Sequence, residues 1–474
     1  MSLPLDLSIE QCQQARMSRD ARFDGKFYIA VKTTGIYCRP ICPAPAPKEV
    51  NVDYYGSAIE AANNGFRPCL RCRPDSAPGS YAWKGVDTTV ERALKLIDQG
   101  ALIEGSVADL AERLGISDRH LRGLFQDKLG TSPKSYALYQ QLLFAKQLLH
   151  QTNMTITDVA YASGFHSVRR FNDGFKQHFQ LTPQQLRKQQ KPQGECLNLW
   201  LSYRPPYRWD LMQQFLAKRL VEGLEWIDED SYGRTFSWPD AQGAAPIVGH
   251  FTAIHDAQKH GFNIKLGVQS GQVILPVVRN IRRILDLDTD ITLIEQQLKQ
   301  MPAIGKHVVS GLRLPGIWDS FEAGIRAILG QQISVEAARK LVLRLVTYYG
   351  QSIDVNGEKR MLFPTPEQLQ GVDFMELKMP HTRRLTLQGL SRFCLQQGFD
   401  HDLDLWLGIK GIGPWTVNYA KMRGQSDTDI WLGSDLGVIK ALKQMNDNPA
   451  SRLFECNDAT PWRSYLTFQC WNLL

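Results

Sequence analysis

Apolar and polar positions follow different patterns in successive parts of the chain, and each pattern predicts a different kind of structure. The two kinds of residue alternate over 23–38, which predicts a β-hairpin, and residues 51–55 and 57–64 predict a further strand and a short helix. Over residues 86–190 apolar positions recur at helical spacing. After residue 196 alternation returns, and from Ile281 onward helical patterns dominate. The expected order is a small mixed module, a helical region, an α+β unit and a second helical domain.

The helical region of residues 86–190 divides into two helix-turn-helix units. In the first, a helix over 106–115 turns at Gly115, and Ser117 caps a second helix that runs to Lys128. In the other, a helix over 155–164 precedes one that begins at Ser167, and a helix over 134–151 joins the two units. The second helices carry the candidate DNA contacts Arg119, Arg122, Arg169, Arg170 and Lys176. The simpler alternative is a pair of helical hairpins whose charges only face solvent.

Residues 187–195 are polar with Pro and Gly, and they predict a linker. Beyond them we expect an amphipathic helix over 209–222 and strands at 196–203, 234–238, 250–254 and 262–266.

Length and charge narrow the class of protein. A chain of 474 residues is too long for one core and predicts about three or more domains. Residues 1–195 hold 25 Lys and Arg against 19 Asp and Glu, and the remainder holds 30 against 29, so the basic N-terminal part favours a polyanionic partner. No apolar run approaches the ~20 residues of a membrane-spanning helix, and the N-terminus lacks a secretory signal pattern. We therefore expect a cytoplasmic protein with no membrane partner.

Four of the nine cysteines form two close pairs. Three residues separate Cys38 from Cys42 and two separate Cys69 from Cys72, a spacing that lets two short loops deliver four thiolates to one tetrahedral Zn²⁺. The other five cysteines are scattered, which suits a reducing compartment. By spacing alone, a purely structural zinc knot is the more common outcome.

The segments TTGIYCRPICPAP and GFRPCLRCRPD resemble the N-terminal domain of the Ada family, over nearly all of residues 10–76. The resemblance implies that a zinc-bound cysteine, here Cys38, irreversibly takes a methyl group from a methylphosphotriester in DNA. Zinc keeps the thiolates deprotonated, and methylation of one thiolate removes a unit of negative charge, so repulsion of DNA phosphate weakens. Arg67 and Arg71, beside the second cysteine pair, suit phosphate contacts.

The segment GFHSVRRFNDGFKQHFQLTPQQLRK resembles the signature of AraC-type transcription regulators. The resemblance implies that both recognition helices enter successive major grooves of DNA, and RNA polymerase is the expected protein partner. Gln180 stands where a glycine is usual, so a glycine C-cap is lost.

The motif LGIKGIGPW at residues 407–415 lies between two predicted helices. Gly411 and Gly413 allow a tight turn that exposes backbone N–H groups near a helix N-terminus, where a DNA phosphate can bind. Asp435 follows Gly413 by 22 residues, close to the spacing in helix-hairpin-helix glycosylases. For GIG alone, a plain interhelical turn is the more common case.

Four segments, RPPYRWDLMQQF, LPGIWDSFEAGIRAILGQQISV, GIGPWTVNYAKMRG and PWRSYLTFQCW, resemble AlkA-type 3-methyladenine DNA glycosylases over residues 196–474. The resemblance implies that Asp435 is the catalytic carboxylate and that Gln332 occupies the position from which a side chain enters the vacated base stack. The implied lining of the base pocket is Trp415, Tyr419, Trp471 and Phe215. The alternatives are an N-cap or salt-bridge carboxylate for Asp435 and a core aromatic for Trp471.

The implied chemistry suits these residue types. Alkylated purines such as 3-methyladenine and 7-methylguanine carry positive charge, which aromatic faces attract by ~0.5–2 kcal/mol per contact, and a carboxylate stabilises the oxocarbenium character of the sugar. Trp415 stands where strand-cleaving relatives have a Schiff-base lysine, so we expect base release without strand cleavage. Leu436 and Gln332 depart from the family's aromatic residue and leucine, which leaves the range of excised bases open.

Together these patterns predict a multidomain fusion of an Ada-like α+β zinc module (1–80), an all-α AraC-type double helix-turn-helix domain (81–190), an AlkA-like α+β, TBP-like subdomain (196–283) and an all-α helix-hairpin-helix glycosylase domain (284–474). We expect a bacterial, nucleoid-associated monomer that binds double-stranded DNA and one Zn²⁺, with no cofactor for the glycosylase. No Pro-Cys-His-Arg sequence occurs, so repair of O6-methylguanine is not expected. The rival hypothesis is a transcription regulator whose glycosylase-like domain only binds DNA.

Overall fold

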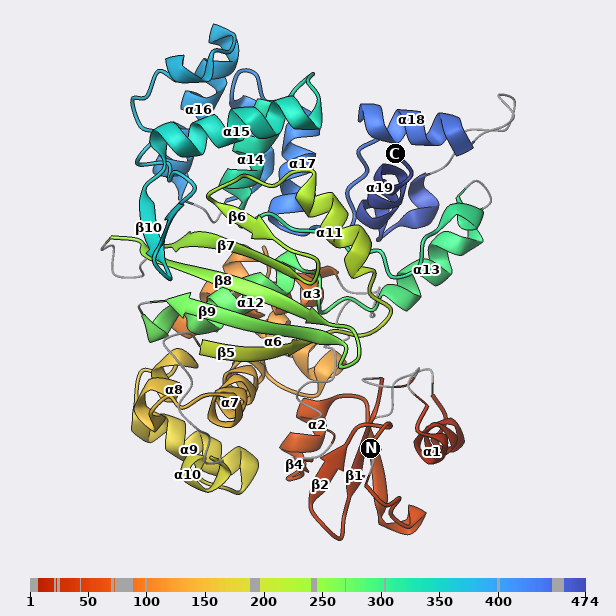
Figure 1. Cartoon of the computed structure of the whole chain (residues 1–474). Helices are drawn as coiled ribbons and strands as arrows, with labels where there is room; N and C mark the ends of the chain where they lie inside the picture. Colours follow the sequence, from red (N-terminus) through yellow and green to blue (C-terminus); the bar gives the residue numbers. More distant parts are fainter. Residues whose placement is uncertain are drawn as a thin grey trace. The chain divides into compact units, whose positions relative to one another are not determined.

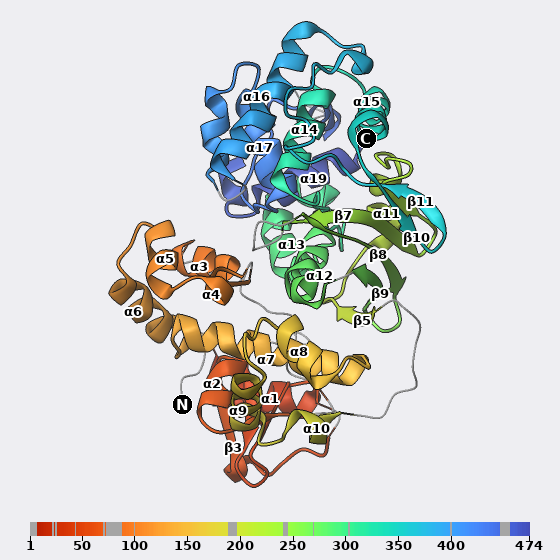
Figure 2. The ribbon, with the colours of Figure 1, turned by 90° about the vertical axis from the view of Figure 1, so that its left-hand side faces the viewer.

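The computed structural model describes residues 7–20, 23, 26–42, 44–69, 72, 88–98, 100–187, 197–239, 245–268, 270–301, 304–398, 401–445 and 456–474. The chain divides into two compact units (Figure 1, Figure 2). Unit 1 comprises Met1–Ser202 with Ser270–Arg279, and unit 2 comprises Tyr203–Gln269 with Asn280–Leu474. Among the described helices, none combines the length and the apolar composition that crossing a bilayer requires.

The N-terminal part of unit 1 is built on a sheet with the strand order β3-β1-β2-β4. Strands β1 (Tyr28–Val31) and β2 (Ile36–Cys38) form the hairpin that was predicted over 23–38. Strand β3 (Val52–Tyr55) pairs with the other edge of β1. Strand β4 (Arg67–Pro68) runs parallel to β2. The helical elements here are α1 (Ile9–Ser18), η2 (Glu49–Asn51) and α2 (Ala58–Asn63), where the helix predicted over 57–64 begins one residue later because Ser57 is its N-cap.

The rest of unit 1 is mainly helical and contains both predicted helix-turn-helix units. Ser117 caps α6 as expected, and Ser167, predicted as the start of its helix, is the N-cap of α9; each side chain accepts the backbone N–H three residues on. Gln180 adopts a left-handed φ of 58° at the end of the second recognition helix, the conformation that glycine takes at less cost. The helices are α3 (Thr88–Asp98), α4 (Ala101–Glu104), α5 (Val107–Arg113), α6 (Asp118–Leu129), α7 (Pro133–Gln151), α8 (Ile156–Ala162), α9 (Val168–Phe179) and α10 (Pro183–Leu186), and β5 (Leu197–Ser202), η5 (Gly271–Val273) and the start of α12 (Ile274–Ile284) complete the unit.

Unit 2 contains an antiparallel sheet in which β9 (Gly261–Val268), β8 (Ile247–Asp256), β7 (Ser231–Trp238) and β6 (Glu225–Ile227) follow one another. The helix predicted over 209–222 is shorter in the structure, where α11 (Trp209–Ala217) ends at Ala217. The Arg219 guanidinium folds back over the ring of Phe215 at 3.7 Å, and the Glu225 carboxylate accepts the N–H of Val221 at 2.9 Å. Beyond Ala217 the N–H groups of Arg219 and Leu220 bond three residues back, to the carbonyls of Leu216 and Ala217, and the chain then continues into β6.

The remainder of unit 2 is helical with one exception, a hairpin of β10 (Ser352–Val355) and β11 (Glu358–Met361) that the sequence analysis did not predict. Asn356 and Gly357 both take positive φ, as a two-residue hairpin turn requires. The helices are α13 (Ile291–Gln300), η6 (Gly305–His307), α14 (Ser320–Gly330), α15 (Val335–Tyr349), η7 (Met375–Leu377), α16 (His381–Gln397), η8 (Leu403–Gly408), α17 (Pro414–Gly424), α18 (Leu436–Met445), η9 (Cys456–Ala459) and α19 (Arg463–Asn472).

Helix α17 lies between the two hydrophobic cores of these helices. One core contains the fully buried Trp406, and the other contains Phe468 of α19. Val417 and Ala420 of α17 belong to the first core, whereas Met422 belongs to the second. Side chains on α17 are therefore held from both sides.

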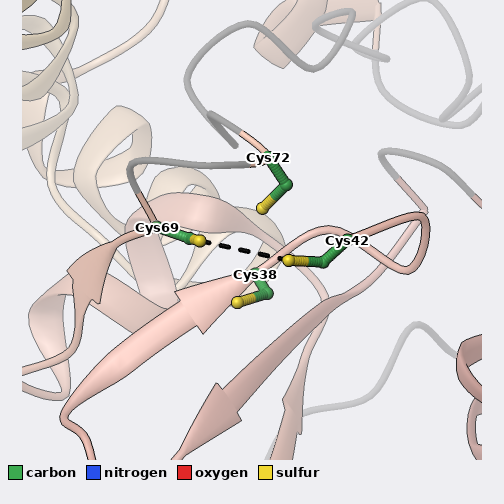
Figure 3. A group of neighbouring side chains, drawn as sticks. All are labelled: Cys38, Cys42, Cys69 and Cys72. Carbon is green, nitrogen blue, oxygen red and sulfur yellow. Dashed lines mark hydrogen bonds between the residues drawn. The ribbon is translucent and has the colours of Figure 1, made fainter. Parts of the chain in front are cut away.

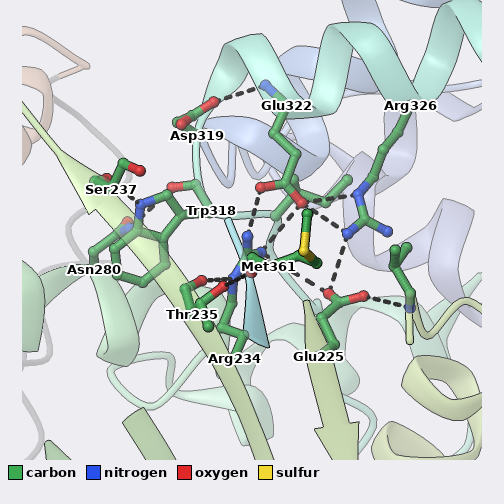
Figure 4. A network of polar contacts seen from close by, with 12 residues as sticks. Glu225, Arg234, Thr235, Ser237, Asn280, Trp318, Asp319, Glu322, Arg326 and Met361 are labelled. Carbon is green, nitrogen blue, oxygen red and sulfur yellow. Dashed lines mark hydrogen bonds and ion pairs between the residues drawn. The ribbon is translucent and has the colours of Figure 1, made fainter. Parts of the chain in front are cut away.

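A buried ion-pair network joins the sheet to α14 (Figure 4). Arg234 of β7 donates two hydrogen bonds to the Glu322 carboxylate, at 3.2 and 2.7 Å, and both side chains are at most 2% exposed. Arg326, one turn after Glu322, donates to Glu322 at 2.8 Å and lies 3.2 Å from Glu225 of β6. Each charge is thus matched by an opposite charge away from water, which makes removal of any one of them costly.

We expect Glu322→Ala to lower the free energy of unfolding of unit 2 by ~3–5 kcal/mol, because Arg234 loses its bidentate partner inside the protein. Urea unfolding followed by tryptophan fluorescence measures this, since nine of the eleven tryptophans lie in unit 2. The control is Lys340→Ala, which removes an exposed pair with Glu336. Equal midpoints for the two variants would contradict the assigned role of the network.

Candidate functional site

Four cysteine sulfurs meet where β2 ends and where the segment after β4 begins (Figure 3). The parallel pairing of Tyr37 with Pro68 sets Cys38 beside Cys69, whose N–H donates to the Tyr37 carbonyl at 2.9 Å. The four sulfurs all lie within 4.8 Å of one another. Ligands of a tetrahedral Zn²⁺, each ~2.3 Å from the metal, are ~3.8 Å apart, so this spacing fits one ion.

The surroundings of the sulfurs differ from one cysteine to the next. The hydrogen bond with Cys38 lowers the pKa of Cys42 to about 7, and the hydrogen bonds with Cys42, Cys69 and Cys72 raise the pKa of Cys38. The backbone N–H of Arg39 donates to the Cys72 sulfur at 3.3 Å. Cys69 and Cys72 are only 7–8% exposed, whereas Cys38 and Cys42 are half-buried. Two of the four cysteines are therefore less buried than the other two.

Tyr37, the residue before Cys38, connects the zinc module to the helices of unit 1. This contact was not predicted. Tyr37 is fully buried, and its hydroxyl hydrogen-bonds to the hydroxyl of Tyr139 in the middle of α7. Tyr139 in turn lies against His178 of α9, with ring centroids 6.4 Å apart. Alternation predicted that Tyr37 lies in a strand, but no sequence pattern connects positions 37 and 139.

The candidate DNA contacts in unit 1 lie at the surface. Helices α6 and α9 bury one apolar face each, with Phe125 and Phe171 fully buried. Their exposed faces carry the predicted basic residues Arg119, Arg122, Arg169, Arg170 and Lys176. Arg67 is half-buried in β4, and Arg71 lies outside the described residues.

In unit 2, the four predicted pocket aromatics come together from three helices. Trp415 and Tyr419 of α17 stack with centroids 5.3 Å apart, and Tyr419 lies 6.3 Å from Trp471 of α19. The ring of Phe215, from α11, is nearly parallel to that of Trp471, at 14° and 6.3 Å. The four aromatic residues that the motifs predicted therefore lie in one cluster.

Asp435 lies against this cluster, immediately before α18. Its Oδ2 accepts the indole N–H of Trp415 at 3.2 Å, and its Oδ1 accepts that of Trp471 at 2.9 Å. Oδ1 also accepts the backbone N–H groups of Gly437 and Val438, at 2.9 and 3.2 Å. The carboxylate is therefore the N-cap of α18, as the alternative hypothesis for Asp435 had it. It is also the common acceptor of two tryptophan N–H groups, which a cap alone does not require. Both indoles turn their N–H edges toward the carboxylate.

Gly437, which was not among the predicted site residues, allows this close approach. A Cβ atom at this position would lie 2.9 Å from Asp435 Oδ1 and 3.2 Å from Trp471 Cδ1, too near for either to stay in place. The available signal was a glycine two residues after the candidate carboxylate.

Two arginines beside Phe215 were also missed. The guanidinium carbons of Arg219 and Arg423 lie 3.7 and 4.9 Å from the centre of the Phe215 ring. Burial lowers the pKa of Arg219 to about 10, and the charge of Asp435 is among the groups that act against this decrease. The aromatic cluster is thus placed between a buried positive charge and a carboxylate.

The predicted glycine hairpin connects η8 to α17. Gly411 has a φ of +94°, and a Cβ there would lie 2.1 Å from Thr386 Oγ1 of α16, so both conformation and space require glycine. Gly413 precedes Pro414, the first residue of α17. Gln332 is exposed in the turn between α14 and α15, with a φ of 57° that is rare for a residue with a side chain.

Three family models match the chain: the metal binding domain of Ada over residues 11–75, a helix-turn-helix domain over 110–189 and the AlkA N-terminal domain over 198–319. One relative, a probable bifunctional transcriptional activator/DNA repair enzyme AlkA of Mycobacterium tuberculosis, is 34% identical across 98% of this chain and 96% of its own length. The chain belongs to this AlkA family of bifunctional activator/repair proteins.

Two other relatives each match one part of this AlkA family member. DNA-3-methyladenine glycosylase 2 of Escherichia coli is 31% identical over 57% of this chain and 95% of its own length. The bifunctional transcriptional activator/DNA repair enzyme Ada of the same organism is 37% identical over 30% of this chain and 38% of its own length. The predicted fusion of an Ada-type and an AlkA-type part is confirmed.

The sulfur cluster and the Ada metal-binding model agree, so Cys38, Cys42, Cys69 and Cys72 form a site for one Zn²⁺. The helix-turn-helix match makes DNA a partner of this AlkA family member.

Proposed function

We propose that this protein responds to alkylated DNA in two ways: unit 2 hydrolyses the glycosidic bond of alkylated bases, and the zinc module takes a methyl group from a DNA methylphosphotriester onto Cys38. The observation that carries the first activity is the Asp435 carboxylate, held by two indole N–H groups at the edge of an aromatic cluster. The second rests on the four-sulfur site and on membership of a family whose relatives include Ada.

The aromatic cluster suits a planar, electron-poor base. Phe215 and Trp471 are nearly parallel with centroids 6.3 Å apart, close to the ~7 Å that two layers of van der Waals contact would need. A base turned out of the duplex can stack against these rings, and a cationic base such as 3-methyladenine or 7-methylguanine gains ~0.5–2 kcal/mol from each aromatic face. Selection by stacking rather than by hydrogen bonds suits a range of alkylated bases.

Asp435 supplies the negative charge that bond cleavage requires. As the C1′–N bond breaks, its electron pair leaves with the base and C1′ becomes oxocarbenium-like; a carboxylate beside C1′ stabilises this charge. A water molecule then adds to C1′ and loses its proton. The indole and backbone donors hold the carboxylate in one orientation, so little reorganisation accompanies the reaction.

We propose that the enzyme does not cleave the DNA strand. Strand cleavage by relatives depends on a lysine amine that attacks C1′, and here Trp415 occupies the corresponding place in the hairpin. Lys421 lies further along α17, where its ammonium pairs with Asp404 at 2.7 Å. Water is therefore the nucleophile that the site provides.

The first residues of α17, Pro414 and Trp415, carry no side-chain amine. The nearest lysine of the turn, Lys410, precedes Gly411 and is exposed. A stacking indole therefore stands where an attacking lysine would have to be.

Cys38 is the proposed methyl acceptor in the zinc module. Its sulfur attacks the methyl carbon of the phosphotriester, a C–S bond forms as the C–O bond breaks, and the phosphodiester leaves with the electron pair. A bound Zn²⁺ keeps such a sulfur deprotonated and nucleophilic at neutral pH. Burial of Cys69 and Cys72 disfavours them as acceptors, and the resemblance to Ada favours Cys38 over Cys42, which is also only partly buried.

The remaining predicted contacts concern how the protein holds DNA. We propose that Arg119, Arg122, Arg169, Arg170 and Lys176 contact promoter DNA, and that Arg67 and Arg71 contact the damaged backbone. We further propose that the N–H groups of Gly411 and Gly413 bind a phosphate and that Gln332 enters the space left by the extruded base. The protein would act as a cytoplasmic monomer on nucleoid DNA, with RNA polymerase as its protein partner.

The rival hypothesis is a regulator in which unit 2 only binds DNA. The arrangement of Asp435 argues against it, because DNA binding alone does not require a carboxylate beside an aromatic cluster. Release of alkylated bases from methylated duplex DNA distinguishes the two hypotheses.

We expect Asp435→Asn to lower the rate of base release by roughly 100-fold or more while DNA binding is preserved. Asparagine caps a helix about as well as aspartate does, so the substitution removes the charge without removing the cap of α18. Chromatographic analysis of bases released from methylated DNA measures the rate, and calorimetry checks the fold. Turnover equal to that of the wild type would exclude Asp435 as the catalytic carboxylate.

We expect no covalent protein–DNA adduct when borohydride is added during base release, because a tryptophan replaces the lysine that would form the Schiff base. Gel electrophoresis detects such adducts, and a strand-cleaving glycosylase serves as the positive control. A trapped adduct would refute the monofunctional mechanism.

We expect methylphosphotriester DNA to add ~14 Da to Cys38, the mass of one methyl group in place of one hydrogen. Peptide mass spectrometry locates the addition. Cys394→Ser, which changes a buried cysteine outside the cluster, should accept the methyl group normally. Addition to Cys42 instead would reassign the acceptor.

A further inference from the structure

The exposed turn that carries Gln332 is attached to the glycine hairpin by the preceding residue, Gln331. The Nε2 amide of Gln331 donates to the carbonyl of Gly411 at 3.1 Å and to Thr416 Oγ1 at 3.2 Å. One side chain thus contacts both the tip of the hairpin and the first turn of α17. These two glutamines are neighbours in sequence, but only Gln332 is fully at the surface.

The backbone of this turn is held from a second side. The carbonyl of Gln331 accepts a hydrogen bond from Arg383 of α16 at 2.9 Å. Ser334 caps α15 through its hydroxyl, which accepts the N–H of Ala337 at 3.2 Å. Gln332 therefore takes its left-handed φ of 57° between two anchored residues. A non-glycine residue keeps such a conformation only where its surroundings impose it.

The glycine hairpin and the Gln332 turn are proposed to contact the same DNA at the same time. Gly411 and Gly413 are proposed to hold a phosphate, and Gln332 is proposed to enter the base stack. A side chain can replace an extruded base only if its distance from the bound backbone is set in advance, and misplacement by about 1 Å can cost ~100-fold in rate. Gln331 is the side chain that links the two elements directly.

We infer that Gln331 is a positioning residue for base extrusion: its amide fixes the Gln332 turn to the glycine hairpin, so that phosphate binding and insertion of Gln332 occur in register. This inference rests on the proposed glycosylase function. Gln331 acts through Gln332 and the hairpin and does not itself contact the reacting atoms.

The test uses Gln331→Met, which keeps the length of the side chain and removes both hydrogen-bond donors. The matched control is Gln297→Met, because Gln297 likewise donates to two carbonyls, those of Asp458 and Thr460, at 2.7 and 2.8 Å. If the two variants lose similar thermal stability, a loss of base extrusion that occurs only in Gln331→Met is due to positioning and not to stability.

Base extrusion is measured by the fluorescence of 2-aminopurine placed beside 7-methylguanine in a duplex, with Asp435→Asn as the background so that no base is released. We expect Gln331→Met to reduce the fluorescence increase by roughly 10-fold and the Gln297→Met control to retain it. In proteins with Asp435 intact, the single-turnover rate should fall by a similar factor. The affinity for a duplex with an abasic site, where no base needs to be displaced, should change by less than about 3-fold.

Thr416→Val provides an internal check, because it removes one of the two bonds of Gln331 and leaves the one to Gly411. Its effect should be smaller than that of Gln331→Met, and the double variant should be no worse than Gln331→Met alone. The inference would be overturned if Gln331→Met gave the same fluorescence increase as the Asp435→Asn background. It would also be overturned if that background itself gave no increase. Failure of the wild type to release any base would instead overturn the proposed function, since the fluorescence measurement does not depend on cleavage.

Discussion

The buried charges between the sheet and α14 are the constraint on which the aromatic cluster depends. Three of its rings come from α17 and α19, but Phe215 comes from α11, next to the sheet. Arg326 belongs to the ion-pair network and also contacts the carbonyl of Arg219 at 3.5 Å, and Arg219 covers Phe215. Because a buried charge without its partner is costly, arrangements that separate the sheet from α14 are disfavoured. Phe215 is thereby kept opposite Trp471.

Asp435 shows how one side chain can satisfy a structural and a chemical requirement together. The backbone N–H groups at the start of α18 need an acceptor, and any good N-cap would supply it. The two indole N–H groups of Trp415 and Trp471 are the distinctive part, since they turn toward the carboxylate from separate helices. Gly437 provides the space for this convergence. The cap therefore explains the position of Asp435, and the tryptophans distinguish its environment from that of an ordinary N-cap.

Where sequence reasoning succeeded, the signal was local. Periodicity and caps predicted α5 to α9 closely, because the side chains of Ser117 and Ser167 bond within their own helix turns. It failed where a distant contact decides the outcome. The partners of Gln331, for example, lie 80 and 85 residues away along the chain. The missed hairpin at Asn356 is different, since its Asn-Gly turn was a visible local signal.

The sequence by itself determined the order of the modules, the four zinc ligands and the residues of the aromatic cluster, because cysteine spacing, apolar period and family motifs are written in short segments. It could not determine that Trp415 and Trp471 share one carboxylate, that Tyr37 meets Tyr139, or that Gln331 joins the turn of Gln332 to the hairpin. Those contacts exist only after packing brings separate helices within hydrogen-bond distance. A hydrogen bond depends on separation and angle in space, and spacing along the chain sets neither across different elements.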